Sequence, residues 1–157
     1  MENRLEILRQ KVDELIYLAQ RDRQRDFFIH LYEVSHFGAL LAIKRGLDPE
    51  LASTCGMLHD ISAVISGSYD NHALNGAVEA RKILESNNLY TKGEIDIIVT
   101  AISRHSDKDK KQLPYDEVLK DADVLSHCLY NPSFPVKEHE QSRYNSLIIE
   151  FGVNNAV

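Results

Sequence analysis

The chain carries imidazole and carboxylate side chains within, or at the ends of, segments that otherwise have the apolar pattern of core helices. The set is His36, the adjacent pair His59 and Asp60, His72, His105 and Asp123. First-row divalent metal ions are bound by such nitrogen and oxygen ligands. A buried carboxylate without a partner is costly, and a bound cation would remove that cost for both aspartates. The pattern therefore predicts a metal-dependent hydrolytic site.

The other three histidines receive a structural interpretation, because a lone histidine is usually a hydrogen-bonded or solvated side chain. His30 and His139 have charged neighbours. His127 is the least clearly excluded of the three, because it lies one helical turn after Asp123.

The spacing of apolar residues predicts an all-α protein, a compact bundle of about six to seven helices. A polar connection at 21–26 separates the first two helices, and a small polar stretch covers 62–69. The expected helices lie at 4–20, 27–45, 48–61, 70–87, 91–105 and 115–129, with a last one after 136. The segment 147–153 is rich enough in branched residues to be read as either strand or helix.

Local signals support several of these boundaries. Gly46 is a typical C-terminal glycine, and Asp48 with Pro49 is a typical helix start. Thr91 followed by Glu94 has the spacing of a capping box.

Length and composition indicate a single domain over residues 1–157, with its core at about 27–128. The 157 residues are 43% hydrophobic and 27% charged, as in a globular protein. The net charge of −6 argues against a general nucleic-acid-binding protein, and we expect no DNA partner. Two isolated cysteines, Cys55 and Cys128, provide neither a zinc-binding pair nor a disulfide framework.

The first residues mix charged and apolar side chains, so no secretory signal is visible. The apolar run at 37–43 is too short to span a bilayer. We therefore expect a cytoplasmic protein without a membrane partner.

The order and context of these motifs resemble the HD-domain superfamily of metal-dependent phosphohydrolases. The segment 35–42 resembles the first-histidine helix, 52–61 resembles the helix that ends in the His-Asp pair, and 121–123 resembles the last ligand motif. The segments 72–77 and 102–105 resemble the two additional histidine motifs of binuclear members. The resemblance covers about residues 27–128.

The resemblance implies one ion held by His36, His59, Asp60 and Asp123. It implies a second ion held by His72 and His105, with Asp60 as the bridge. His59 and Asp60 would be the catalytic pair, and the nucleophile would be a metal-activated hydroxide. The ligand chemistry fits iron, manganese, cobalt or nickel and does not choose among them.

The implied substrate is a small phosphorylated molecule of the nucleotide type, cleaved at a phosphate ester or phosphoanhydride. Four cations near the last histidine motif are candidates for binding its phosphates, or equally for a solvated loop. They are Arg104, Lys108, Lys110 and Lys111. The residues after Asp60 lack the acidic side chains of HD enzymes that hydrolyse guanosine alarmones.

Two other functions remain open at this point. A mononuclear nucleotidase would use His72 and His105 to contact substrate, and a non-catalytic regulatory HD module would hold metal structurally. The sequence also leaves open whether residues 136–157 form a lid over the site or the contact of a homodimer.

Overall fold

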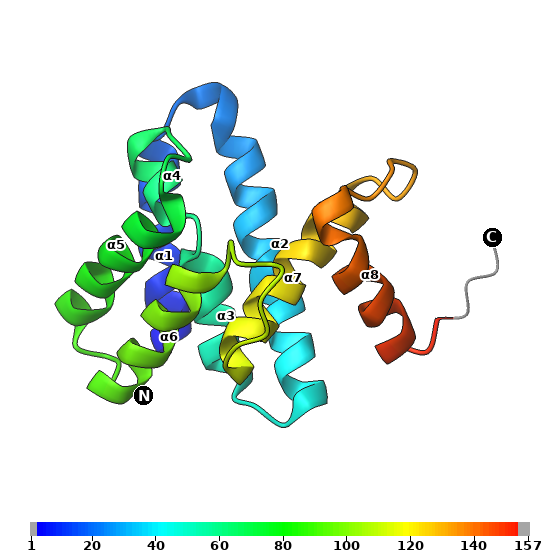
Figure 1. Cartoon of the computed structure of the whole chain (residues 1–157). Coiled ribbons are helices and arrows are strands. Elements are labelled where there is room, and N and C mark those ends of the chain that lie inside the picture. The colour runs from blue at the N-terminus through cyan, green and yellow to red at the C-terminus, as the bar shows by residue number, and fades with distance from the viewer. Residues whose placement is uncertain (1–2, 154–157) are drawn as a thin grey trace.

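The computed structural model describes residues 3–153, which form eight helices and no strand (Figure 1). The all-α prediction is therefore confirmed. The helices are α1 (Arg4–Leu18), α2 (Arg21–Arg45), α3 (Pro49–Leu58), α4 (Ile61–Ser66), α5 (His72–Asn87), α6 (Lys92–Arg104), α7 (Pro114–Tyr130) and α8 (Glu138–Glu150).

Helix ends follow the predicted capping chemistry in several places. The side chain of Asp48 accepts hydrogen bonds from two backbone N–H groups at the start of α3, with Pro49 at the first helical position. Thr91 and Glu94 form the capping box of α6. Gly46 ends α2 with a φ of 70°, a left-handed conformation in which a glycine is unstrained.

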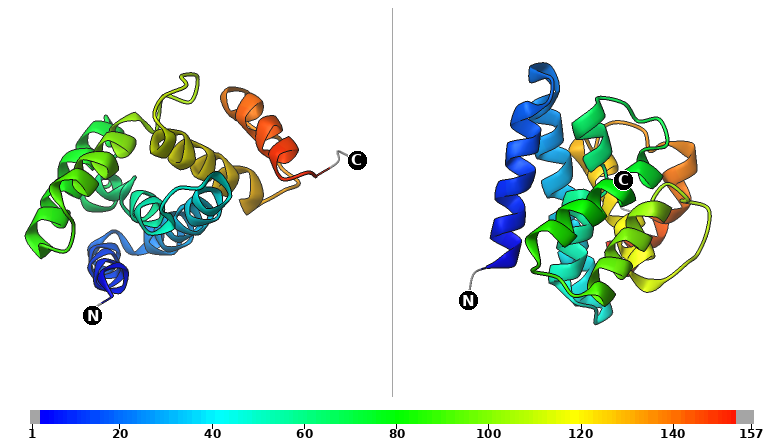
Figure 2. Two further views of the ribbon diagram at one scale, coloured as in Figure 1. Left: turned by 90° about the horizontal axis from the view of Figure 1, so that it is seen from below. Right: turned by 90° about the vertical axis from the view of Figure 1, so that its left-hand side faces the viewer.

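The long helix α2 lies at the centre of the bundle and packs against α3 and α7. Helices α5 and α6 pack together at one end of the molecule, and α8 packs against α7 at the other (Figure 2). Helix α1 runs beside α2 and contacts α3 and α4. No helix among residues 3–153 is long and apolar enough to cross a membrane.

Two glycines allow helices to approach the segment that carries the His-Asp pair. A Cβ on Gly56 would lie 2.5 Å from the backbone nitrogen of Ser35, so α2 and α3 touch through their backbones here. A Cβ on Gly76 would lie 2.8 Å from the carbonyl oxygen of His59. These contacts set the distance between α2, α3 and α5.

The structure corrects two of the expected boundaries and assigns the segment that the sequence left open. Helix α2 begins at Arg21, and not at residue 27 as expected. Its first turns are polar and largely exposed, but arginine and glutamine favour a helix even where no apolar stripe is present. The helix at 48–61 ends at Leu58, and Ile61 starts the additional short helix α4. The segment up to Glu150 is helical, so its branched residues do not form a strand there.

Two positively charged side chains, Lys120 and Arg143, bind the backbone of the loop between α6 and α7. The Nζ atom of Lys120, which is completely buried, donates to the carbonyl of Lys110 at 2.9 Å and to Glu117 at 3.0 Å. Arg143 of α8 donates to the carbonyls of Lys108 at 2.6 Å and Lys110 at 2.8 Å. The backbone of the loop is thus tied to α7 and α8.

Substituting Gly56→Ala should destabilise the protein strongly, because the new methyl group meets backbone atoms of α2 that cannot rotate away. Overpacking typically costs about 1–3 kcal/mol, and a backbone clash belongs at or above the upper end. The free energy of unfolding, measured by urea denaturation, is the readout.

Gly93→Ala is the matched control, because nothing lies within 4 Å of a Cβ at that helical position. It should leave stability unchanged or raise it by up to about 1 kcal/mol. Equal stability of the two variants would contradict the close contact between α2 and α3.

Candidate metal centre

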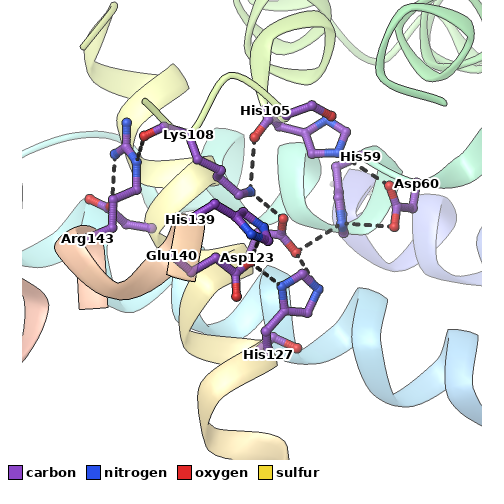
Figure 3. A network of polar contacts seen from close by, with 12 residues as sticks. His59, Asp60, His105, Lys108, Asp123, His127, His139, Glu140 and Arg143 are labelled. Atoms are coloured by element: carbon purple, nitrogen blue, oxygen red, sulfur yellow. Dashed lines mark hydrogen bonds and ion pairs between the residues drawn. The ribbon is translucent and has the colours of Figure 1, made fainter. Parts of the chain in front are cut away.

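Five histidines and two aspartates from several helices form overlapping groups that could hold metal ions. Figure 3 shows five of these residues, His59, Asp60, His105, Asp123 and His127. His30 comes from α2, and His59 and Asp60 lie at the junction of α3 and α4. His72 is the first residue of α5, His105 follows α6, and Asp123 and His127 lie on α7. Because α3 ends just before His59 and α4 begins just after Asp60, this pair lies in a helix break and faces the side chains from α2, α5, α6 and α7.

The carboxylate of Asp60 divides its two oxygens between two pairs of histidines. Its Oδ1 atom lies 3.4 Å from Nε2 of His105 and 3.7 Å from Nε2 of His72. Its Oδ2 atom lies 3.5 Å from Nε2 of His59 and 3.6 Å from Nε2 of His30. This geometry is suited to a carboxylate that bridges two cations.

The carboxylate of Asp123 has a similar division of roles. Its Oδ1 atom lies 3.3 Å from His30, 3.7 Å from His59 and 3.4 Å from His127, in each case measured to Nε2. Its Oδ2 atom accepts a hydrogen bond from the ammonium group of Lys108. Lys108 also donates to the carbonyl of His105, so it links the α6–α7 loop to α7.

All five imidazoles are oriented by a hydrogen bond at Nδ1. The acceptors for His59, His105 and His72 are the carbonyls of Gly56, Ile102 and Tyr69, at 2.7–2.9 Å. His30 donates to Ser126, whose hydroxyl donates on to Glu33, and His127 donates to Glu140. Since Nδ1 carries the proton, the lone pair of a neutral ring is at Nε2, which faces the site.

Burial and charge favour the protonation states that a metal ion requires. Complete burial lowers the pKa of His59 to about 4, only partly offset by the two aspartates. Burial alone would raise the pKa of Asp123, but the charge of Lys108 and the nearby imidazoles hold it well below its usual range. At neutral pH His59 is therefore neutral and Asp123 ionised, as ligands must be.

A divalent cation fits this donor set. Oδ1 of Asp60 and Oδ1 of Asp123 are buried and accept no hydrogen bond. Nε2 of His30 lies 3.1 Å from Nε2 of His59, so two nitrogen lone pairs face each other when both rings are neutral. A cation between these atoms would satisfy the orphaned oxygens and relieve the repulsion between lone pairs.

The structure contradicts the placement of His36 with the other predicted ligands. His36 is exposed, and among residues 3–153 every group of side chains able to hold a metal excludes it. His30 takes its place. Six residues along a helix correspond to a rotation of about 240°, so the two rings project from different faces of α2. The other five predicted residues, His59, Asp60, His72, His105 and Asp123, do lie together.

The four predicted phosphate-binding cations are placed differently from one another. Lys108 is at the site. Arg104 pairs with the buried Asp116 at 2.9 Å, and Lys110 pairs with Asp107 at 3.2 Å on the surface. Lys111 is exposed. Of the four, only Lys108 therefore lies beside the metal-binding side chains, and its ammonium group is already paired with Asp123.

A cavity of about 450 Å³ opens onto the metal-binding side chains. Two cations that the sequence interpretation missed, Arg23 and Lys137, line it. Arg23 lies over the rings of Phe27 and Tyr69 and donates to the carbonyl of Gly67. Arg23 was missed because residues 21–26 were expected to form a connection. In the structure they belong to α2, so Arg23 lies two helical turns before His30 on the same helix.

Comparison with known proteins identifies relatives over the same region. The chain is 32% identical to Ribonuclease Y of Chlorobium luteolum over 97 residues, 62% of this chain and 17% of the relative. It is 33% identical to Ribonuclease Y of Clostridium botulinum over 119 residues, 72% of this chain and 21% of the relative. The chain thus spans about a fifth of the length of these relatives. No solved structure matches.

The family model described as HD domain matches residues 27–127, which include every side chain of the converging site. This match covers most of the chain and agrees with the all-α fold and with the His-Asp pair between α3 and α4. The chain therefore belongs to the HD-domain family.

Proposed function

We propose that the chain is a metal-dependent phosphohydrolase that cleaves a phosphate ester or phosphoanhydride bond of a nucleotide-like substrate. The observation that supports this most strongly is the pair of buried carboxylates, Asp60 and Asp123, each with an oxygen that faces only imidazole nitrogens. Membership of a superfamily of metal-dependent phosphohydrolases gives the reaction class.

The division of the Asp60 oxygens supports two ions rather than one. His30 and His59 lie on the Oδ2 side, and His72 and His105 lie on the Oδ1 side. We infer that Asp60 bridges the two positions. In the mononuclear alternative, His72 and His105 would instead contact the substrate.

Divalent ions bound here would polarise the phosphoryl group and lower the pKa of a water nucleophile. The chain's own cations would then orient the substrate. Arg23 and Lys137 line the cavity, and both can pair with phosphate oxygens. Lys108 keeps one oxygen of Asp123 occupied, which leaves the other oxygen directed at His30.

The names of the relatives favour RNA as a second candidate substrate, since they are ribonucleases. The net charge of −6 and the confined cavity favour a small nucleotide. Both substrates present the same chemistry to the site, a phosphate linked to a nucleoside.

The variants His30→Ala and His36→Ala provide a direct test of the ligand set. We expect His30→Ala to bind less metal per chain, because His30 lies 3.3 Å from Asp123 and 3.6 Å from Asp60. His36→Ala should bind as much metal as the unmodified chain, because His36 is exposed on another face of α2. Elemental analysis after desalting measures the ions per chain.

The comparison is matched, because both substitutions remove one imidazole from the same helix. Loss of metal in His36→Ala but not in His30→Ala would contradict the proposed ligand set.

Chelation and substrate screening test the reaction itself. The metal-stripped protein should be inactive, and manganese, iron, cobalt or nickel should restore hydrolysis of nucleotides. Asp60→Asn should lower turnover by more than about 100-fold, since even outer-shell partners of metal ligands cost about 10–100-fold. Phosphate release from a nucleotide panel and cleavage of a labelled oligoribonucleotide are measured in parallel.

If the protein cleaves the oligoribonucleotide and none of the nucleotides, the proposed substrate is RNA and not a small nucleotide. Absence of activity on both substrates, with any of the four metals, would contradict the enzymatic role and favour a non-catalytic metal-binding module.

A further inference from the structure

We infer that His127 is a further metal ligand, which shares an ion with His30 and Asp123 and is oriented by Glu140 of α8. The inference rests on the metal centre of the proposed function and enlarges its ligand set. His127 and Glu140 stand outside the six residues that the motif order predicts.

The first step is the position of the His127 ring. Its Nε2 atom lies 3.4 Å from Oδ1 of Asp123, the same oxygen that lies 3.3 Å from Nε2 of His30. The rings of His127 and His30 are parallel within 2°, with centroids 5.1 Å apart. The potential ligand atoms of His30, Asp123 and His127 all lie within 4.8 Å of one another.

The second step is the hydrogen bond that sets this position. Nδ1 of His127 donates to Oε1 of Glu140 at 2.7 Å, and Glu140 is only 1% exposed (Figure 3). A carboxylate at one ring nitrogen fixes the tautomer and directs the lone pair of the other nitrogen. The arrangement repeats at His127 what backbone carbonyls do at His59, His72 and His105.

The third step concerns the atom that His127 faces. Oδ1 of Asp123 is buried, lacks a hydrogen-bond partner and points into the site. A neutral His127 ring that donates from Nδ1 to Glu140 presents a lone pair, and no proton, to this oxygen through Nε2. A cation shared by His127, His30 and Asp123 accounts for both the orphaned oxygen and the orientation of the ring.

Helix α8 thereby becomes part of the site. The match to the HD family ends at residue 127, and α8 spans Glu138–Glu150. Glu140 and Arg143 lie one helical turn apart, and Arg143 donates to the carbonyl of Lys108, whose side chain holds the other oxygen of Asp123. Both oxygens of Asp123 therefore have an environment that α8 helps to set.

The test is the affinity of the metal-stripped full chain for Co²⁺, measured by calorimetry and by the visible absorption of the bound ion. We expect His127→Ala and the larger, less disruptive His127→Gln to weaken binding of one ion by more than about 10-fold and to change the cobalt spectrum. Glu140→Gln should weaken it by about 10–100-fold, as for other carboxylates behind a ligating histidine.

His139→Ala is the control, because His139 is the exposed neighbour of Glu140, at 3.9 Å, and should bind cobalt as the unmodified chain does. Thermal unfolding of each metal-free variant identifies any that are misfolded, and the remaining variants decide the question. Unchanged cobalt affinity and spectrum in folded His127→Gln and Glu140→Gln would overturn the inference, even if their KM for substrate rose. Failure of the unmodified chain to bind cobalt would overturn the proposed function as well.

Discussion

Two carboxylates buried close together are the constraint on which the rest of the site depends. Asp60 and Asp123 are each 5% exposed, and both have an oxygen without a hydrogen-bond partner. Taking charges out of water is costly unless they are paired, and Lys108 pairs with only one of the four oxygens. The histidines around them present lone pairs rather than protons when neutral, so they cannot compensate the charge without a cation.

The positions of the helix ends bring the site residues to these two carboxylates. Four of the site residues occur at helix boundaries: His59, Asp60, His72 and His105. At these positions each of the three imidazoles donates a hydrogen bond to a backbone carbonyl three residues earlier in the chain. Gly56 brings the backbones of α2 and α3 into contact, and this contact places His30 next to His59. His59, His72 and His105 are thus oriented by main-chain carbonyls, whereas His30 and His127 are oriented by the side chains of Ser126 and Glu140.

Local signals in the sequence predict the helical fold, and they also predict five of the seven side chains that converge in the structure. Apolar spacing, Pro49, Gly46 and the Thr91–Glu94 box act within a few residues. The choice between His30 and His36 depends instead on which face of α2 meets α3 and α7. His36 lies two helical turns before Ile43, which is 66% exposed, so this face of α2 does not point into the core. The role of α8 depends on contacts across the bundle, which periodicity does not reveal.

The central claim is that Asp60 and Asp123 share a metal centre with His30, and anomalous diffraction from crystals grown with Mn²⁺ tests it most directly. The account predicts anomalous density between the two carboxylates, in contact with His30 and His59, and further density on the His72 and His105 side of Asp60. Crystals with no anomalous density between Asp60 and Asp123, or with manganese at His36 instead, would contradict the account.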